Sequence, residues 1–160
     1  LISAPEAVVL DPDIFNFDWA PTGVQLAYSS FATGSCGTTA CPLIYIYALG
    51  GAPYLLTDGG QPAWSSNGAK IAFRTNGGFG DIATINPDGS GRTTILQGHA
   101  GRFIDLSRPR WSPAGTHLTY HRFGAFGSNI WEVYRATANG SSPANLTGDL
   151  SNPALPVAWR

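Results

Sequence analysis

The sequence predicts an all-β chain made of a repeated unit of four antiparallel strands. The first observation is a recurring segment that opens on a tryptophan, and these tryptophans stand 45, 47 and 48 residues apart at Trp19, Trp64, Trp111 and Trp159. The second is a glycine four residues later, as a tight turn with positive φ favours, at Gly23, Gly68 and Gly115. The third is that 20 glycines and 12 prolines separate short β-rich runs, with no apolar helical period between them.

Each repeat accommodates four short strands. The first strand ends at the tryptophan and covers residues 16–19, 62–64, 109–111 and 157–159. The second follows the glycine turn and covers residues 25–28, 70–73 and 117–120. The third covers residues 43–47, 81–85 and 129–134, and in its first copy Ile44 and Ile46 alternate as in a half-buried strand. The fourth follows a second glycine-bearing turn and covers residues 54–57, 93–96 and 145–147.

A period in the forties with four strands per period is typical of the blades of a β-propeller. Residues 1–160 then form a single partial propeller, with blades at 16–60, 61–107 and 108–155 and the first strand of a next blade at 156–160. Residues 1–15 fit the end of a preceding blade or a linker. Because closed propellers typically have about four to eight blades, we expect an incomplete ring of three to four blades.

The sequence of the repeat resembles the TolB-like branch of WD-type propeller repeats. The resemblance is carried by Pro62-Ala-Trp-Ser-Ser-Asn-Gly68, Pro109-Arg-Trp-Ser-Pro-Ala-Gly115 and Asn86-Pro-Asp-Gly89, and it covers roughly residues 16–160. The aspartate usual in the first turn is replaced by Thr22, Asn67 and Ala114. The resemblance implies a propeller fold. Similar repeats occur in periplasmic TolB, which contacts protein partners, and in the propellers that gate prolyl-oligopeptidase-type serine peptidases.

The composition argues against two kinds of partner. Charged residues make up 12% of the chain and the net charge is −1, so no basic stripe is present to bind nucleic acid. No run of apolar residues is long enough to cross a membrane as a helix. No cofactor motif occurs, and we expect no cofactor.

The only two cysteines, Cys36 and Cys41, lie in one segment rich in glycine and threonine. This proximity favours a disulfide bond between them, and with it an oxidising compartment. A zinc site is disfavoured because a second cysteine pair is absent. Two free thiols in a cytosolic loop are the alternative.

The sequence offers no catalytic constellation. No Gly-x-Ser-x-Gly nucleophile elbow occurs, and Ser90, which has a glycine on both sides, fits a turn between strands. His99, His117 and His121 have no sequence-adjacent carboxylate and fit surface or strand positions. We therefore expect a protein that is not an enzyme.

The longest loops, at 31–42, 75–80, 98–108 and 123–128, open on one face of a propeller. They carry aromatic and basic residues of the kind that interaction surfaces contain: Phe31, Phe79, Arg102, Phe103, Ile104, Arg108, Phe123 and Phe126. The alternative is that these side chains fold back and cap the blades. Both interpretations stay open at this point.

Together these observations favour a non-catalytic, exported propeller segment, periplasmic or extracellular, that mediates protein–protein contact as an accessory or scaffold part of a cell-envelope assembly. One alternative is the gating propeller of a larger serine peptidase. Another is a propeller that binds a small molecule or sugar, with Asn16, Gln61 and Arg110 of the first strands at its channel. The expected partners are other chains or further blades, which would bury residues 7–10 and 157–159 at the two ends.

Overall fold

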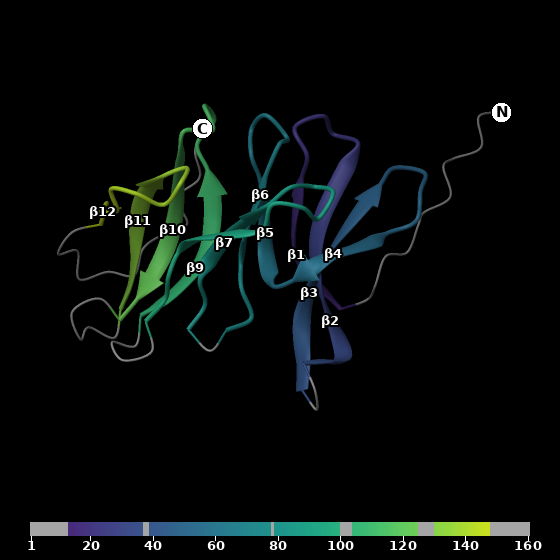
Figure 1. Cartoon of the computed structure of the whole chain (residues 1–160), viewed down its shortest axis with the longest axis horizontal. Helices are drawn as coiled ribbons and strands as arrows, with labels where there is room; N and C mark the ends of the chain where they lie inside the picture. The colour runs from purple at the N-terminus through teal and green to yellow at the C-terminus, as the bar shows by residue number, and fades with distance from the viewer. Residues whose placement is uncertain (1–12, 37–38, 78, 100–103, 125–129, 148–160) are drawn as a thin grey trace.

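The computed structural model describes residues 13–36, 39–77, 79–99, 104–124 and 130–147 of the 160-residue chain. Within these residues the regular secondary structure is β-strand, and no helix occurs. The strands form three sheets, each of four antiparallel strands in chain order (Figure 1). The predicted all-β architecture of four-stranded blades is therefore confirmed.

The first sheet, sheet 1, consists of β1 (Ile14–Trp19), β2 (Gln25–Cys36), β3 (Thr39–Ala48) and β4 (Tyr54–Asp58). Sheet 2 consists of β5 (Gly60–Trp64), β6 (Ile71–Arg74), β7 (Ile82–Ile85) and β8 (Thr93–Leu96). Sheet 3 consists of β9 (Asp105–Trp111), β10 (His117–Phe123), β11 (Trp131–Thr137) and β12 (Ala144–Asn145). In each sheet consecutive strands are neighbours, which is the meander of a propeller blade.

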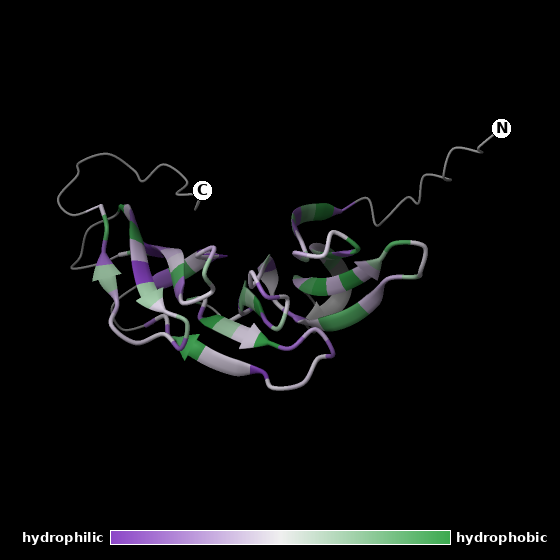
Figure 2. Ribbon diagram, turned by 90° about the horizontal axis from the view of Figure 1, so that it is seen from above, coloured by the Kyte–Doolittle hydropathy of each residue, from purple (hydrophilic) through white to green (hydrophobic). Residues whose placement is uncertain are grey.

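The three sheets stand side by side along an arc, and the arc does not close into a ring (Figure 2). Neighbouring sheets meet through their first strands, since β1 contacts β5 and β5 contacts β9. The second strands join these contacts, β2 against β5 and β6 against β9. The residues of the first strands are therefore brought together from repeats that are far apart in the sequence.

The first turn of each repeat has the same geometry. Gly23, Gly68 and Gly115 have φ values of 71°, 71° and 68°, so the predicted positive φ is confirmed at all three. In the second copy the side chain of Asn67 takes the part of the missing aspartate, because its Oδ1 accepts a hydrogen bond from the Ala69 N–H at 3.1 Å. The replacement of the usual aspartate by Asn67 therefore does not disrupt this turn.

The core lies between the sheets rather than within any one of them. Sheets 1 and 2 share a cluster in which Ile44 and Ile46 of β3 face Phe73 of β6, and all three are fully buried. Sheets 2 and 3 share a second cluster that includes Ile82 of β7 and Leu106 of β9. The alternation of Ile44 and Ile46 thus marks the side of sheet 1 that packs against sheet 2.

Several strand boundaries differ from those expected from the sequence. Strands β2 and β3 extend into the segment expected to be a loop, because their ladder continues through Phe31↔Pro42 and Cys36↔Thr39, with a register shift between these pairs. Strand β9 begins at Asp105, inside the segment expected to be a loop, and β12 covers only Ala144–Asn145. Once two strands are in register, each further pair adds backbone hydrogen bonds, so a glycine-bearing segment can extend the ladder.

Two sequence predictions fall outside the described residues. Residues 7–10, residues 157–159 and the repeat tryptophan Trp159 lie in the terminal segments 1–12 and 148–160. Cys41 is buried in β3, but the side chain of Cys36 is not among those described, so the bond between Cys36 and Cys41 stays a prediction.

Across the described residues, no helical segment has the length and apolar character required for a membrane span.

Candidate binding surfaces

Equivalent positions of the three first strands differ in exposure. Phe17, Pro62 and Pro109 each stand two residues before the repeat tryptophan, and the two prolines are fully buried while Phe17 is 59% exposed. At the tryptophan position, Trp64 is 6% exposed and Trp19 is 45% exposed. The side of β1 that carries Phe17 and Trp19 is therefore uncovered where the same side of β5 is covered.

The preceding sheet provides the cover for β5 and β9. The backbone N–H of Trp64 donates to Asp18 Oδ2 of sheet 1 at 2.7 Å. The indole Nε1 of Trp111 donates to the carbonyl oxygen of Ala63 in sheet 2 at 3.1 Å. By the same repeat, Trp19 faces the position of a sheet before sheet 1, and the described residues include no such sheet.

The second strand of sheet 1 does not share this exposure, because Leu26 and Tyr28 of β2 are 9% and 2% exposed. Leu26 and Tyr28 of β2 pair with Trp19 and Phe17 and share one side of sheet 1 with them. Their equivalents in β6 are Ile71 and Phe73, which pack against sheet 1 in the core cluster. The equivalents in β10, Leu118 and Tyr120, are likewise buried. We call the side of sheet 1 with Phe17, Trp19, Leu26 and Tyr28 the outer face of sheet 1.

The carboxyl group of Asp18 lies at the junction between sheets 1 and 2. Burial raises its pKa, while the hydrogen bond from Trp64 and the positive charge of Arg110 act in the opposite direction and do not cancel the rise. This carboxylate therefore has a structural role, because it holds the first strand of one sheet to the first strand of the next.

The structure separates the residues of the predicted contact surface. Phe31 is 46% exposed, and its ring stacks on that of Phe15 with the centroids 4.7 Å apart. Phe123 ends β10 and is partly buried against Trp131, at a centroid distance of 5.1 Å. Arg108 is exposed on β9. Both aromatic side chains pack on a ring of their own sheet. For the partly buried Phe123, this packing agrees with the alternative that these side chains cap the blades.

One residue of that surface was predicted wrongly. Ile104 is 8% exposed and belongs to the core cluster with Ile82, and it forms an isolated bridge with His99. Three further members lie outside the described residues: Arg102, Phe103 and Phe126.

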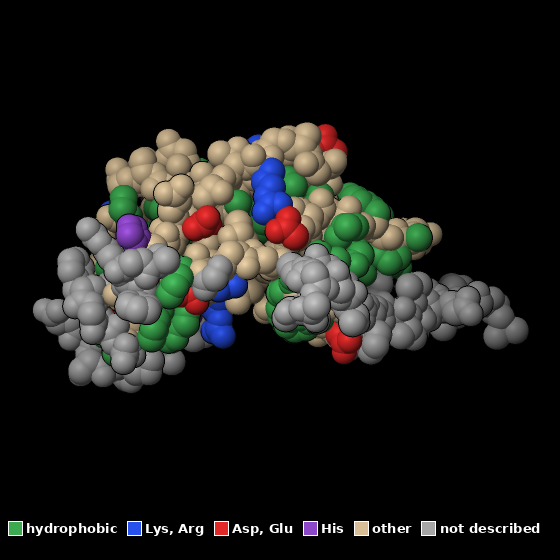
Figure 3. Space-filling model, turned by 60° about the horizontal axis from the view of Figure 1, so that its bottom comes forward, with side chains coloured by type: hydrophobic (Ala, Val, Ile, Leu, Met, Phe, Trp, Pro, Cys, Tyr) green, Lys and Arg blue, Asp and Glu red, His purple; other side chains and the backbone are tan. Residues whose placement is uncertain are grey.

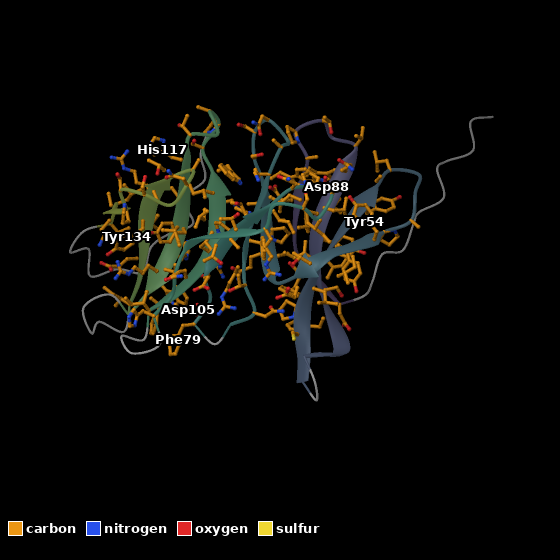
Figure 4. The ribbon with its side chains drawn as sticks, viewed as in Figure 1. Tyr54, Phe79, Asp88, Asp105, His117 and Tyr134 are labelled. Atoms are coloured by element: carbon orange, nitrogen blue, oxygen red, sulfur yellow. The ribbon has the colours of Figure 1, made fainter. Side chains whose placement is uncertain are left out.

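Phe79 lies in a segment that is tied to the next sheet. Asp105 Oδ1 accepts hydrogen bonds from the Gly80 N–H and from Arg74 Nη2, both at 3.1 Å. In Figure 4, Phe79 and Asp105 lie close together at one end of the molecule, opposite the end that carries His117. Asp105 thus holds sheet 3 to the segment of sheet 2 that contains Phe79.

The structure also brings together residues that the sequence suggested for a channel. Asn16, Gln61 and Arg108 stand three residues before their tryptophans, and all three line one cavity of about 180 Å³. Arg110 lines it as well. The remaining lining residues come from the same three sheets: Pro62, Thr119, Tyr120, His121 and Val133. We call this the inner pocket.

Two lining residues have an unusual backbone conformation. Gln61 and Arg108 precede prolines and have φ values of 58° and 51°, in the left-handed region that non-glycine residues rarely adopt. In each case the N–H reaches the preceding sheet: Gln61 N donates to Ser29 Oγ at 2.9 Å, and Arg108 N donates to Gln61 Oε1 at 2.7 Å. These two hydrogen bonds therefore join neighbouring blades beside the inner pocket.

His121 and Tyr120 were not expected at this pocket from the sequence, whereas Asn16, Gln61 and Arg110 were. The signal that could have found the set is positional, because Asn16, Gln61 and Arg108 are equivalent residues of successive repeats. Within the described ranges, no group of three His, Cys, Asp or Glu side chains is arranged to hold a metal ion.

No protein-family model and no curated protein matches the chain. Solved structures do. TolB from Acinetobacter baumannii is 22% identical, with a TM-score of 0.67 over 85% of this chain and 32% of that one. The β-propeller domain of the Trilobed protease from Pyrococcus furiosus is 14% identical, with a TM-score of 0.62 over 82% of this chain and 42% of that one. An oligogalacturonate lyase in complex with manganese is 16% identical, with a TM-score of 0.63 over 86% of this chain and 43% of that one.

These similarities establish the fold. The three sheets are β-propeller blades, and the expected resemblance to TolB-like propellers holds at the level of structure. The chain spans less than half the length of each of these proteins. Since the three proteins have different activities, the shared fold does not assign one of them to this chain.

Proposed function

We propose that the chain is a non-catalytic β-propeller segment that acts by protein–protein contact, as an accessory or scaffold part of an exported cell-envelope assembly. The observation that carries the proposal is the outer face of sheet 1, where Phe17 and Trp19 are 59% and 45% exposed although their equivalents in sheet 2 are buried. Exposed aromatic residues are enriched in protein interfaces.

The repeat itself indicates what kind of partner this face takes. The equivalent faces of sheets 2 and 3 are covered by a four-stranded sheet that presents backbone carbonyl and carboxylate acceptors beside apolar side chains, as Ala63 and Asp18 do. We therefore propose a further four-stranded β-sheet as the occupant of the outer face of sheet 1. Burial of two aromatic side chains gives such a contact several kcal/mol, at about 25 cal/mol for each Å² of apolar surface.

Three features support the non-catalytic and exported parts of the proposal. Ser90, the serine between two glycines, has a turn role, because its N–H and Oγ both donate to Asp88 Oδ1 at 2.9 Å and 2.7 Å. The cysteine pair at Cys36 and Cys41 suits an oxidising compartment. The low charge content of 12% is typical of many secreted β proteins.

The test is the solution behaviour of the 160-residue chain and of a Phe17→Ser/Trp19→Ser variant. We expect the unchanged chain to self-associate in sedimentation velocity or to bind an apolar dye, and we expect the variant to lose both properties while keeping its β-sheet circular dichroism. Leu146→Ser is the matched control, because Leu146 is 47% exposed just beyond β12 and belongs to sheet 3. A monodisperse wild-type chain that binds no dye would contradict the proposal.

A further inference from the structure

The inner pocket is a positively charged cavity in a chain that is poor in charge. Arg108 and Arg110 line it, and no aspartate or glutamate does. The whole chain has nine basic residues and a net charge of −1, and charged side chains are sparse on the face seen in Figure 3. Two arginines at one small cavity therefore create a local field that the rest of the chain does not share.

The carboxylate nearest to Arg108 in the adjoining cavity is engaged elsewhere. A second cavity of about 410 Å³ adjoins the inner pocket and shares Gln61, Arg108 and His121 with it. Its carboxylate, Asp105, is paired with Arg74 at 3.1 Å. Among the described residues, neither Arg108 nor Arg110 forms an ion pair with a carboxylate. The Arg108 guanidinium is therefore available to a ligand, and Arg110 is available too, although it lies near enough to Asp18 to lower the pKa of that carboxyl.

The remaining polar groups of the pocket reinforce a preference for acceptor atoms. Gln61 Oε1 accepts from the Arg108 N–H, so the amide group has its Nε2 donors left for a ligand. Burial, and secondarily the charge of Arg108, lowers the pKa of His121, so the imidazole is neutral near pH 7. The pocket thus combines fixed positive charge with amide and hydroxyl donors.

The pocket also has an apolar wall. Pro62, Tyr120 and Val133 line it and are less than 2%, 3% and 1% exposed. A volume of about 180 Å³ suits a small molecule that has a short hydrocarbon part beside its charged group. Guanidinium groups match the planar geometry of a carboxylate through paired hydrogen bonds.

We propose that the inner pocket binds the carboxylate group of a small organic acid through Arg108 and Arg110. The binding site is formed by three blades, since Asn16, Gln61 and Arg108 come from equivalent positions of successive first strands. The apolar wall at Pro62, Tyr120 and Val133 holds the hydrocarbon part of the acid. This activity is independent of the outer face of sheet 1.

The repeat supplies variants that the fold already tolerates. Arg108→Gln introduces the residue that stands at the equivalent position of β5, where Gln61 has nearly the same left-handed φ and also precedes a proline. Arg110→Ala introduces the residue found at the equivalent position Ala63. Arg135→Gln is the matched control, because Arg135 is exposed on β11 and lines neither cavity.

The experiment is isothermal titration calorimetry of the 160-residue chain with succinate, with its neutral analogue succinamide and with inorganic phosphate. We expect succinate to bind with a Kd below about 1 mM, and succinamide and phosphate to bind at least about 10-fold more weakly. Arg108→Gln and Arg110→Ala each weaken succinate binding by about 10-fold or more, whereas Arg135→Gln changes it by less than about 2-fold.

Three outcomes would overturn the proposal. Equal binding of succinate and succinamide by the unchanged chain shows that charge recognition is absent, and this arm needs no variant to fold. Phosphate binding as tight as that of succinate rejects the carboxylate assignment. Folded Arg108→Gln and Arg110→Ala variants that bind succinate as the wild-type chain does place the ligand outside the inner pocket.

Discussion

Replacing Trp64 and Trp19 by alanine, one at a time, tests whether these equivalent tryptophans differ in how far a neighbouring sheet buries them. Trp64 is 6% exposed in the core cluster with Ile71 and Phe73, and truncation of such a side chain typically costs about 3–5 kcal/mol. Its indole Nε1 is buried without a hydrogen-bond partner among the described residues, so the truncation also removes an unsatisfied donor. We therefore expect a loss near the lower end of that range, about 3 kcal/mol.

Trp19→Ala removes the same side chain from a position that is 45% exposed. Because much of this indole is already in water, we expect a loss of about 1 kcal/mol or less in the isolated chain. Urea unfolding followed by fluorescence of the remaining tryptophans measures both variants. With a slope of about 2 kcal/mol per molar urea, the midpoint falls by about 1.5 M for Trp64→Ala and by about 0.5 M or less for Trp19→Ala.

Equal losses for the two variants would refute the reasoning, because they would mean that Trp19 is as well covered as Trp64. A changed slope for Trp64→Ala alone would signal a loss of two-state behaviour rather than of stability, and its midpoint would then not be compared.

Three further predictions address other parts of the chain. Gly140→Ala should lower the free energy of unfolding in urea by about 3 kcal/mol or more, because a Cβ at this position would meet the backbone oxygen of Ile95 in sheet 2 and because its φ is 84°. A loss below about 1 kcal/mol would show that the turn can move away from Ile95. Burial raises the pKa of Asp18 above 3.8, so its contribution to the free energy of unfolding is present below pH 3.8 and is lost as the pH rises through the folded-state pKa. Asp18→Asn should remove that dependence, and a difference between wild type and variant that is constant across this range would contradict it. Intact mass after non-reducing alkylation should show no alkyl groups on Cys36 and Cys41, and uptake of two groups would show free thiols.

The blades could be predicted from the sequence because their signals are local. A tryptophan, a glycine turn four residues later and an alternating strand recur within each repeat, and the observed φ of Gly68 and the buried alternation of Ile44 and Ile46 follow from them. Turn geometry and strand alternation depend on neighbours a few residues apart, so one repeat is enough to specify them. Three copies then specify the architecture.

The tertiary structure decided the features that depend on residues far apart in the sequence. The sequence placed Ile104 in a loop, and only its packing against Ile82 of sheet 2 makes it part of the core. The exposure of Trp19 depends on which sheet lies in front of it, and the inner pocket is lined by residues that come from all three sheets. Contacts between sheets are non-local, so local sequence patterns specify the blades but not the surfaces that the blades share or leave open.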